Sequence, residues 1–188
     1  MTYLTREDFN KNINEIFYKS KLIGDSWKLL KASVNQDALF YLERIEQKCI
    51  NPNKQDEAEA QSEIYTFVYH VIFSDSFSVP VLYLNVYKSN GSSLNYDELY
   101  SYFNLNSKLN DAYDLVITQQ EHPILFKPFY YVHPCKTADW MIATNPNPES
   151  SESILNYTLK WMSFVFASFN VNLDVKYGLT LDKLKTFV

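Results

Sequence analysis

The chain has 188 residues and a formal net charge of −5, from 17 Lys and Arg against 22 Asp and Glu. This balance argues against nucleic acid or an anionic membrane surface as partner, because both require a basic face. With 3 Gly, 3 His and 2 Cys, the chain has neither a glycine-rich phosphate loop nor a usual zinc-ligand spacing. If the protein is an enzyme, we expect it to use side chains alone, with no cofactor and no metal.

The length predicts one domain spanning residues 1–188. The N-terminus has no apolar run behind a basic segment, and the most apolar stretch, 154–169, is too short and too polar for a membrane span. Two cysteines do not form a disulfide framework. We therefore expect a soluble, cytoplasmic protein with free thiols and no stable membrane insertion.

The first predicted element is a helix that begins after Thr5, a candidate N-cap with Asp8 in the capping-box position. After Gly24 the apolar periodicity changes from about 3.6 to 2, which is typical of strands. The buried stripe of the helix is expected to consist of Phe9, Ile13, Ile16 and Phe17.

Four strands follow, and their short connections favour an antiparallel meander. They are predicted at 27–34, 38–47, 63–74 and 79–88. The polar segment 48–62 between the second and third strands is predicted to be a solvated loop.

The second half contributes a short helix, two short strands, an irregular segment and a long helix. The helix follows Asn95, which has Glu98 in the capping-box position. The predicted ranges are 96–103 for the short helix, 114–120 and 128–133 for the strands, 151–170 for the long helix, and 171–188 for a tail with a helical turn or two. The fold class is therefore α+β, with helices packed on an antiparallel sheet.

The two cysteines have different neighbours. Cys49 lies between a strand and the polar segment with nothing chemical beside it, so we interpret it as incidental. Cys135 follows His133 and Pro134 and precedes Lys136. Because proline favours an extended chain before it, His133 and Cys135 are expected to share one face. A thiol beside a histidine and a lysine is a candidate nucleophile, although a structural cysteine after a proline is the competing interpretation.

Two families of cysteine enzymes do not fit these residues. No arginine closes on Cys135 as a phosphatase loop requires, and no histidine follows it as a papain-like protease requires. His70 lies in the middle of a predicted strand and is interpreted as a core histidine, and His122 is interpreted as a turn residue. A zinc set of His122, His133 and Cys135 has irregular spacing and is disfavoured.

The segment ITQQEHPILFKPFYYVHPCKTADWM, residues 117–141, resembles the autophagy-related conjugating enzymes for ubiquitin-like modifiers. The preceding VPVLYLNVYKSNGSSLNYDELY, residues 79–100, is similar to the fourth strand and following turn of that family. The resemblance implies a fold like that of ubiquitin-conjugating enzymes, with an N-terminal helix, a four-stranded meander, short extra strands and a long C-terminal helix. It also implies that Cys135 is the catalytic cysteine.

The implied reaction is acyl transfer through a thioester. Cys135 would receive autophagy-related protein 12 as modifier from autophagy-related protein 7, the activating enzyme. It would then pass the modifier to a lysine of autophagy-related protein 5, the acceptor, without a separate ligase. This chemistry needs no metal or nucleotide on the protein itself. The implied location is the cytoplasm, with recruitment to the site of autophagosome formation.

Ordinary ubiquitin-conjugating enzymes place a His-Pro-Asn shortly before the cysteine, and this sequence has none there. His133 is our candidate substitute, as an oxyanion donor or as a group that orients the thiol or the lysine. Asp139 is a weaker candidate for attracting the lysine ammonium. Family members tend to carry a tyrosine where this chain has Phe77, so the role of that hydroxyl is not carried over.

Two alternatives stay open from the sequence. One is a non-catalytic adaptor that keeps the shape of a conjugating enzyme, which a buried Cys135 would favour. The other is the lipid-conjugating relative, autophagy-related protein 3. An ordinary core stripe in the first helix and a short segment at 48–62 favour the protein-conjugating branch.

Overall fold

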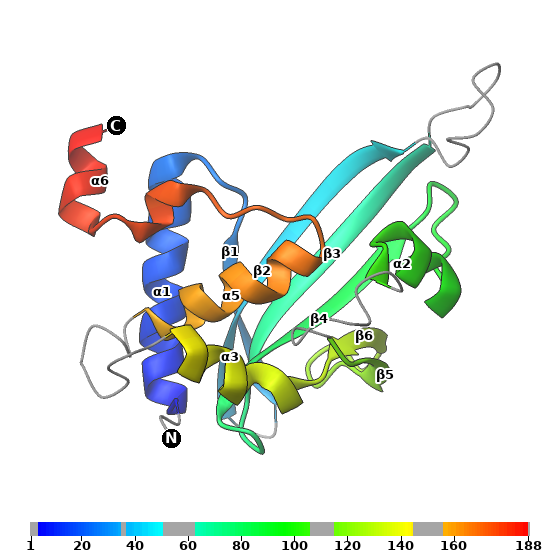
Figure 1. Cartoon of the computed structure of the whole chain (residues 1–188), viewed down its shortest axis with the longest axis horizontal. Coiled ribbons are helices and arrows are strands. Elements are labelled where there is room, and N and C mark those ends of the chain that lie inside the picture. Colours follow the sequence, from blue (N-terminus) through cyan, green and yellow to red (C-terminus); the bar gives the residue numbers. More distant parts are fainter. Residues whose placement is uncertain (1–3, 35–36, 51–62, 106–114, 145–155, 188) are drawn as a thin grey trace.

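The computed structural model describes residues 4–34, 37–50, 63–105, 115–144 and 156–187, which form a six-stranded antiparallel sheet with helices packed on one face (Figure 1). The order of strands across the sheet is β1-β2-β3-β4-β6-β5. The strands are β1 (Lys28–Val34), β2 (Asp37–Ile50), β3 (Glu63–Ser74), β4 (Val79–Tyr87), β5 (Ile117–Glu121) and β6 (Pro128–Val132). The helices are α1 (Arg6–Ile23), α2 (Tyr96–Tyr102), α3 (Thr137–Thr144), α5 (Tyr157–Ser168) and α6 (Leu181–Phe187), with 3₁₀ turns η2 (Pro134–Lys136) and η3 (Val175–Gly178).

Helix α1 forms as its local signals predict. The Thr5 side chain accepts a hydrogen bond from the Asp8 amide at 3.0 Å, which satisfies one of the free amides of the first turn. Gly24 ends the helix at φ 74°, a left-handed conformation in which glycine carries no steric cost. The predicted stripe is confirmed for Phe9, Ile13 and Ile16, which are buried, while Phe17 packs partly buried against the core.

The α+β class and the meander are confirmed. Strands β1 to β4 pair in chain order and antiparallel, and β6 then adds to the free edge of β4. An N-terminal helix, this meander and helices on one face fit a conjugating-enzyme-like fold.

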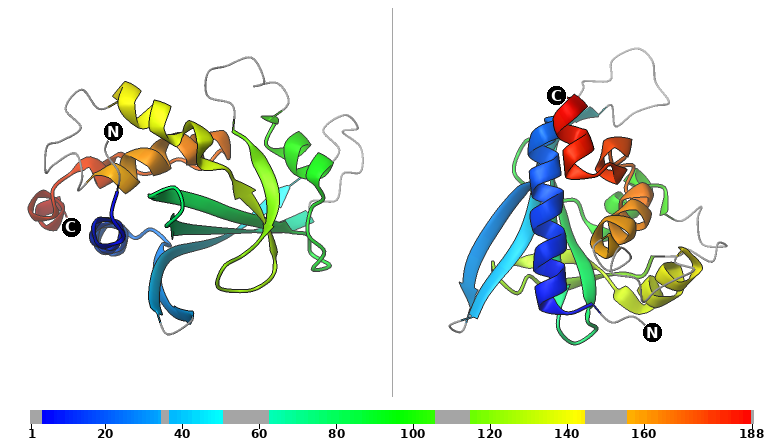
Figure 2. Two further views of the ribbon diagram at one scale, coloured as in Figure 1. Left: turned by 90° about the horizontal axis from the view of Figure 1, so that it is seen from below. Right: turned by 90° about the vertical axis from the view of Figure 1, so that its left-hand side faces the viewer.

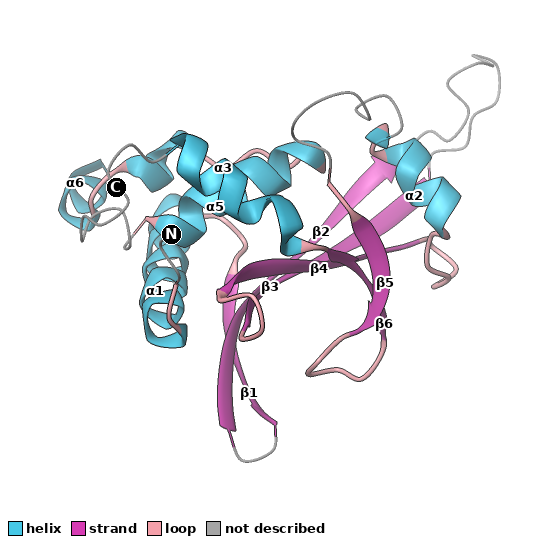
Figure 3. Ribbon diagram, turned by 60° about the horizontal axis from the view of Figure 1, so that its bottom comes forward, coloured by secondary structure: helices cyan, strands magenta, loops and turns pink. Residues whose placement is uncertain are grey.

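The sheet has one face covered by helices and one that is not. Tyr69 of β3 packs edge-on against Phe166 of α5 at 5.6 Å between ring centroids, and Phe73 packs against Phe9 of α1. Figures 2 and 3 show α1, α3 and α5 on this side, while the β1–β2 hairpin and the β5–β6 loop bend toward the other. Because side chains alternate along a strand, His70 of β3 and Tyr83 of β4 lie on the face without helices.

Several elements differ from the prediction. The strand expected at 114–120 is β5, which begins at Ile117 and ends at Glu121. Residues 48–50, expected in the polar loop, continue β2 because they pair with 63–65 of β3, and the rest of the expected loop, 51–62, lies outside the described residues. Helix α3 was not predicted, since no Ser, Thr, Asp or Asn stands in an N-cap position before it. Pro134 instead starts a 3₁₀ turn that leads directly into α3. The long helix is described from Tyr157, and 151–155 lie outside the described residues.

The predicted C-terminal turns are present as η3 and α6, and this tail lies against α1 (Figure 1). The buried Lys19 ammonium of α1 donates to the Tyr177 carbonyl oxygen at 2.9 Å and pairs with Glu15. The Tyr177 hydroxyl donates to Asp25 at 2.8 Å. Hydrogen bonds from Lys19 and to Asp25 thus hold the C-terminal tail against the N-terminal part of the chain. Among the described residues, no helix has the length and apolar character needed to span a bilayer.

Candidate active site

Cys135 lies in the connection between the last strand of the sheet, β6, and helix α3. Strand β6 ends at Val132, the 3₁₀ turn Pro134–Lys136 follows, and α3 begins at Thr137. Pro134 is buried and occupies the first position of the turn, where its fixed φ is compatible and its missing N–H leaves no orphan donor. Cys135 is exposed at the surface, so a partner can reach its thiol.

The relation between His133 and Cys135 corrects the expectation of a shared extended face. His133 is extended, with φ −69° and ψ 132°, but the chain turns immediately after it. The His133 Nδ1 accepts a hydrogen bond from the Cys135 backbone amide at 3.1 Å. The imidazole therefore caps the turn that carries the cysteine, and its contact is with the amide of that residue.

This hydrogen bond determines where the proton of a neutral His133 lies. A nitrogen that accepts from an amide carries no proton itself, so the proton is on Nε2. An Nε2–H group is a donor, which is the type of group that stabilises an oxyanion. The donor role predicted for His133 is therefore chemically available.

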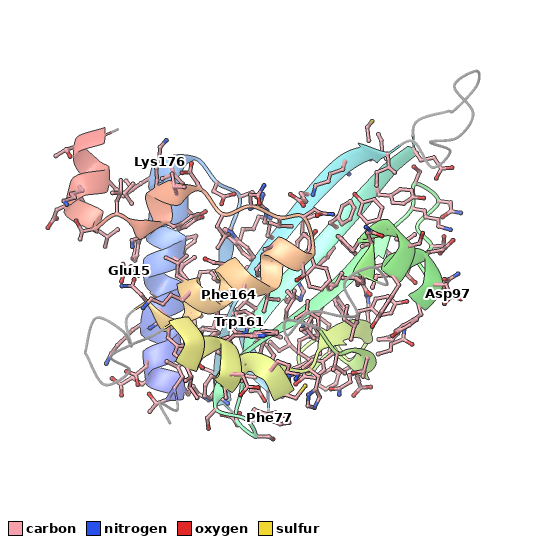
Figure 4. All side chains as sticks on the ribbon, in the orientation of Figure 1. Glu15, Phe77, Asp97, Trp161, Phe164 and Lys176 are labelled. Atoms are coloured by element: carbon pink, nitrogen blue, oxygen red, sulfur yellow. The ribbon has the colours of Figure 1, made fainter. Side chains whose placement is uncertain are left out.

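Two aromatic rings bracket the His133 imidazole. Phe77 packs edge-on against it at 5.3 Å between ring centroids, and Tyr131 of β6 packs edge-on at 6.1 Å. Figure 4 shows Phe77 at the turn between β3 and β4, below the start of α3. Tyr131 was not identified from the sequence. Its position two residues before His133 on a strand is the signal that could have found it, because such side chains share a face.

The Tyr131 hydroxyl stays protonated through the physiological range. Burial, the neighbouring Tyr83 and the negative charge of a Cys135 thiolate raise its pKa to about 12. Tyr131 therefore adds a neutral phenol near the cysteine.

The remaining predicted residues are placed as follows. Asp139 is exposed in the first turn of α3, four residues after Cys135. Cys49 is also exposed, at the end of β2 and opposite Ile64 of β3. Exposure alone does not separate the two thiols. The difference is that the amide of Cys135 is bound by a histidine at a helix entrance, while Cys49 stands on a strand.

His70 and His122 are both buried, and the structure brings them together. His70 Nδ1 and His122 Nε2 are 2.8 Å apart across 52 residues of sequence. The sequence placed His70 in the core and His122 in a turn, which the structure confirms, but it did not indicate their contact. His122 therefore points to His70 and does not join His133. Within the described ranges, no three His, Cys, Asp or Glu side chains gather as a metal site would require.

Comparison with known proteins agrees with this architecture. The model of the family described as autophagocytosis-associated protein, active-site domain, matches residues 8–174, and the chain belongs to this family. It is 28% identical over 205 residues to the human ubiquitin-like-conjugating enzyme ATG10, covering 94% of this chain and 93% of the relative.

Two further relatives carry the same name. The ATG10 of Arabidopsis thaliana is 31% identical over 71% of this chain and 59% of the relative, and that of Dictyostelium discoideum is 34% identical over 58% and 53%. The resemblance to autophagy conjugating enzymes is thereby confirmed, and the similarity extends to ATG10.

Proposed function

We propose that this protein is a ubiquitin-like-protein conjugating enzyme of autophagy that uses Cys135 as its nucleophile. The supporting observation is an exposed thiol in a 3₁₀ turn whose amide is bound by His133 Nδ1 at 3.1 Å. The relatives named as ubiquitin-like-conjugating enzymes support the same class. The finer assignment carries over from the family resemblance, with autophagy-related proteins 7, 12 and 5 as activating enzyme, modifier and acceptor.

The first step loads the modifier. The Cys135 thiolate attacks the thioester carbonyl that joins the modifier's C-terminus to the activating enzyme. A new thioester forms on Cys135, and the cysteine of the activating enzyme leaves as a thiolate. Exposure of Cys135 is required for this step, because two large proteins must meet at one sulfur.

The second step transfers the modifier to an amine. The lysine ammonium of the acceptor first loses a proton to water. The neutral amine then attacks the thioester carbonyl, the attacking nitrogen releases a second proton to water, and the isopeptide bond forms as the Cys135 thiolate leaves. The carbonyl oxygen is negatively charged in the tetrahedral intermediate, and His133 Nε2–H is the donor that we assign to it. Asp139, exposed on α3, contributes more weakly by attracting the incoming ammonium.

The non-catalytic adaptor is the less favoured alternative. A buried cysteine would support it, and Cys135 is exposed. The lipid-conjugating branch is disfavoured because the curated relatives reported above carry the name ATG10. We propose a cytoplasmic location with recruitment to the site of autophagosome formation.

A loading assay tests the proposal. The protein is incubated with activating enzyme, ATP and modifier, and separated on a non-reducing gel. We expect a thiol-sensitive adduct that Cys135→Ala abolishes, and Cys135→Ser to give at most an oxyester that resists thiol. Cys49→Ser, at the other exposed thiol, is the matched control and should load normally. An adduct that survives in Cys135→Ala but is lost in Cys49→Ser contradicts the site.

A further inference from the structure

A continuous hydrogen-bonded chain runs through the buried histidines beneath the β5–β6 loop. His122 Nδ1 accepts from the amides of Ile124 and Leu125 at 3.2 and 3.1 Å. His70 Nδ1 lies 2.8 Å from His122 Nε2, and His70 Nε2 lies 3.1 Å from Glu43 Oε2. We call the three side chains Glu43, His70 and His122 the histidine clamp.

Every proton in the histidine clamp is assigned by its neighbours. Because two amides donate to His122 Nδ1, the proton of His122 is on Nε2 and is donated to His70 Nδ1. His70 then carries its own proton on Nε2 and donates it to the Glu43 carboxylate. In this hydrogen-bonded chain every donor points the same way, from the loop amides toward Glu43. All of its hydrogen bonds form only while both imidazoles are neutral.

The surroundings keep both histidines neutral. Burial lowers the pKa of His70 to about 4, and burial together with the charge of His70 lowers that of His122 to about 3. Two further titratable groups face the pair. The ring of Tyr41 in β2 lies 5.2 Å from that of His70, and the ring of Tyr83 in β4 lies 5.0 Å from that of His122. Lys28 of β1 lies 3.9 Å from Glu43.

The histidine clamp lies at the loop end of the β5–β6 hairpin. The opposite end of this hairpin leads through His133 to Cys135. The β4–β6 ladder consists of the pairs Leu82↔Val132, Tyr83↔Tyr131 and Leu84↔Tyr130. Phe129 lies beyond these pairs and stacks on His70 at 5.4 Å. At the opposite end, the His133 amide donates to the Val116 carbonyl oxygen at 2.8 Å. The β5–β6 hairpin is thus held by the histidine clamp at its loop end and by this backbone hydrogen bond of His133 at its other end.

A row of aromatic contacts joins the two ends directly. The ring centroids of His122 and Tyr83 are 5.0 Å apart, those of Tyr83 and Tyr131 are 5.0 Å apart, and those of Tyr131 and His133 are 6.1 Å apart. Packed side chains transmit strain, so this row of rings is a physical route by which the position of His122 can affect the orientation of His133.

We propose that His122 and His70 are positioning residues for the conjugation reaction, holding the β5–β6 hairpin so that His133 and Cys135 keep their geometry. This inference rests on the proposed function. It assigns a task to two histidines that make no contact with Cys135. A misplacement of about 1 Å caused by a distant mutation can slow a reaction about 100-fold, so loss of the histidine clamp should slow the transfer step.

The main test uses His122→Asn and His70→Leu in a single-turnover discharge of preformed thioester to the acceptor. The Asn oxygen can still accept from the loop amides, but it is too short to reach His70. We expect transfer from loaded enzyme to slow about tenfold in each variant, with the acceptor concentration at half-maximal rate unchanged. The double variant should slow no further, because both changes break one chain.

Val68→Ala is the matched control, since Val68 is half-buried on the same strand and face as His70 and is not in the chain. Its rate for each loaded molecule should match wild type even where its stability is lower. Transfer at the wild-type rate in folded His122→Asn and His70→Leu overturns the positioning role.

A measurement without substrate separates this inference from the proposed function. Nitrogen NMR of the wild-type imidazoles should find His70, His122 and His133 protonated on Nε2, and the His133 signals should shift in His122→Asn but not in Val68→Ala. Unchanged His133 signals in His122→Asn overturn the inference, whether or not the protein forms a thioester. If the His133 signals shift in His122→Asn as expected but the wild-type protein does not load modifier, the proposed function is refuted and the inference about the histidine clamp is not.

Discussion

The Phe77 ring lies edge-on against the His133 imidazole, with centroids 5.3 Å apart and planes at 76°. Phe77 is 45% exposed in the turn between β3 and β4, so the pair lies at the surface beside Cys135. The resemblance implied a tyrosine at this position, and this chain keeps the ring without the hydroxyl. From this contact we expect the Phe77 ring to help orient His133.

Two substitutions of Phe77 distinguish the effect of the aromatic ring from the effect of a hydroxyl on it. Phe77→Leu should slow transfer about threefold, because an aromatic pair contributes about 0.5–1.5 kcal/mol and this one is partly exposed. Phe77→Tyr keeps the pair and should transfer at least as fast as wild type. Single-turnover discharge rates of preloaded enzyme measure both. A Phe77→Leu rate equal to wild type would exclude an orienting role for the ring.

His133 should matter more for transfer than for loading. His133→Ala loses both the turn cap and the Nε2–H donor, and we expect transfer to slow about 100-fold, as for other oxyanion donors. His133→Asn can still accept from the Cys135 amide and donate from its NH₂ group, so it should stay within about tenfold of wild type. Loading and discharge are measured separately. Equal losses in the two steps would indicate a structural role.

Stability should fall with acid through the buried histidines. The pKa of His70 is about 4 and that of His122 about 3 in the folded protein, below their ordinary value near 6.5. The unfolded chain therefore binds protons first, so this stability is fully present above about pH 6.5 and is lost as pH falls toward the folded values.

When the pH is lowered from 7 to 5, each of the two histidines should lower the free energy of unfolding by about 2 kcal/mol. Urea unfolding at the two pH values measures the loss. His122→Asn has one such histidine fewer and should lose less than wild type over the same range. A loss as large as that of wild type would show that His122 does not titrate in this way.

The C-terminal tail should contribute to stability through Tyr177. Tyr177→Phe removes the hydrogen bond from its hydroxyl to Asp25, which measures 2.8 Å, and should lower the free energy of unfolding by about 1 kcal/mol. Tyr18, which is 56% exposed on α1, provides the control Tyr18→Phe, expected to change stability by less than about 0.5 kcal/mol. Urea unfolding of wild type, Tyr177→Phe and Tyr18→Phe measures these changes. Equal unfolding midpoints for wild type and Tyr177→Phe would contradict the prediction.

Asp139 should have a small effect. It is exposed in the first turn of α3, where an attraction for an incoming ammonium is weakened by water and salt. We expect Asp139→Asn to slow transfer about twofold at low salt and not at all in about 1 M salt. A large loss independent of salt would assign Asp139 a direct role in the chemistry.

Local signals were sufficient for the elements that depend on neighbours in sequence. The Thr5 cap, the Gly24 terminator and the apolar stripe predicted α1, and alternating apolar residues predicted the four strands of the meander. Helix α3 was missed because its start depends on the turn at Pro134, which carries no side-chain cap of the usual kind. The end of β2 was missed because polar residues 48–50 pair with β3 through their backbone.

By itself the sequence determined the candidate nucleophile, since Cys135 and His133 are close neighbours along the chain in a motif with few alternatives. Only the tertiary structure decided how these residues are arranged. The turn after Pro134 directs the Cys135 amide to His133 Nδ1, and strand order brings Phe77 to the same imidazole. The contact between His70 and His122 joins segments 52 residues apart. No local pattern encodes such a contact, because it forms only when the sheet register and the path of the β5–β6 loop place two buried rings together.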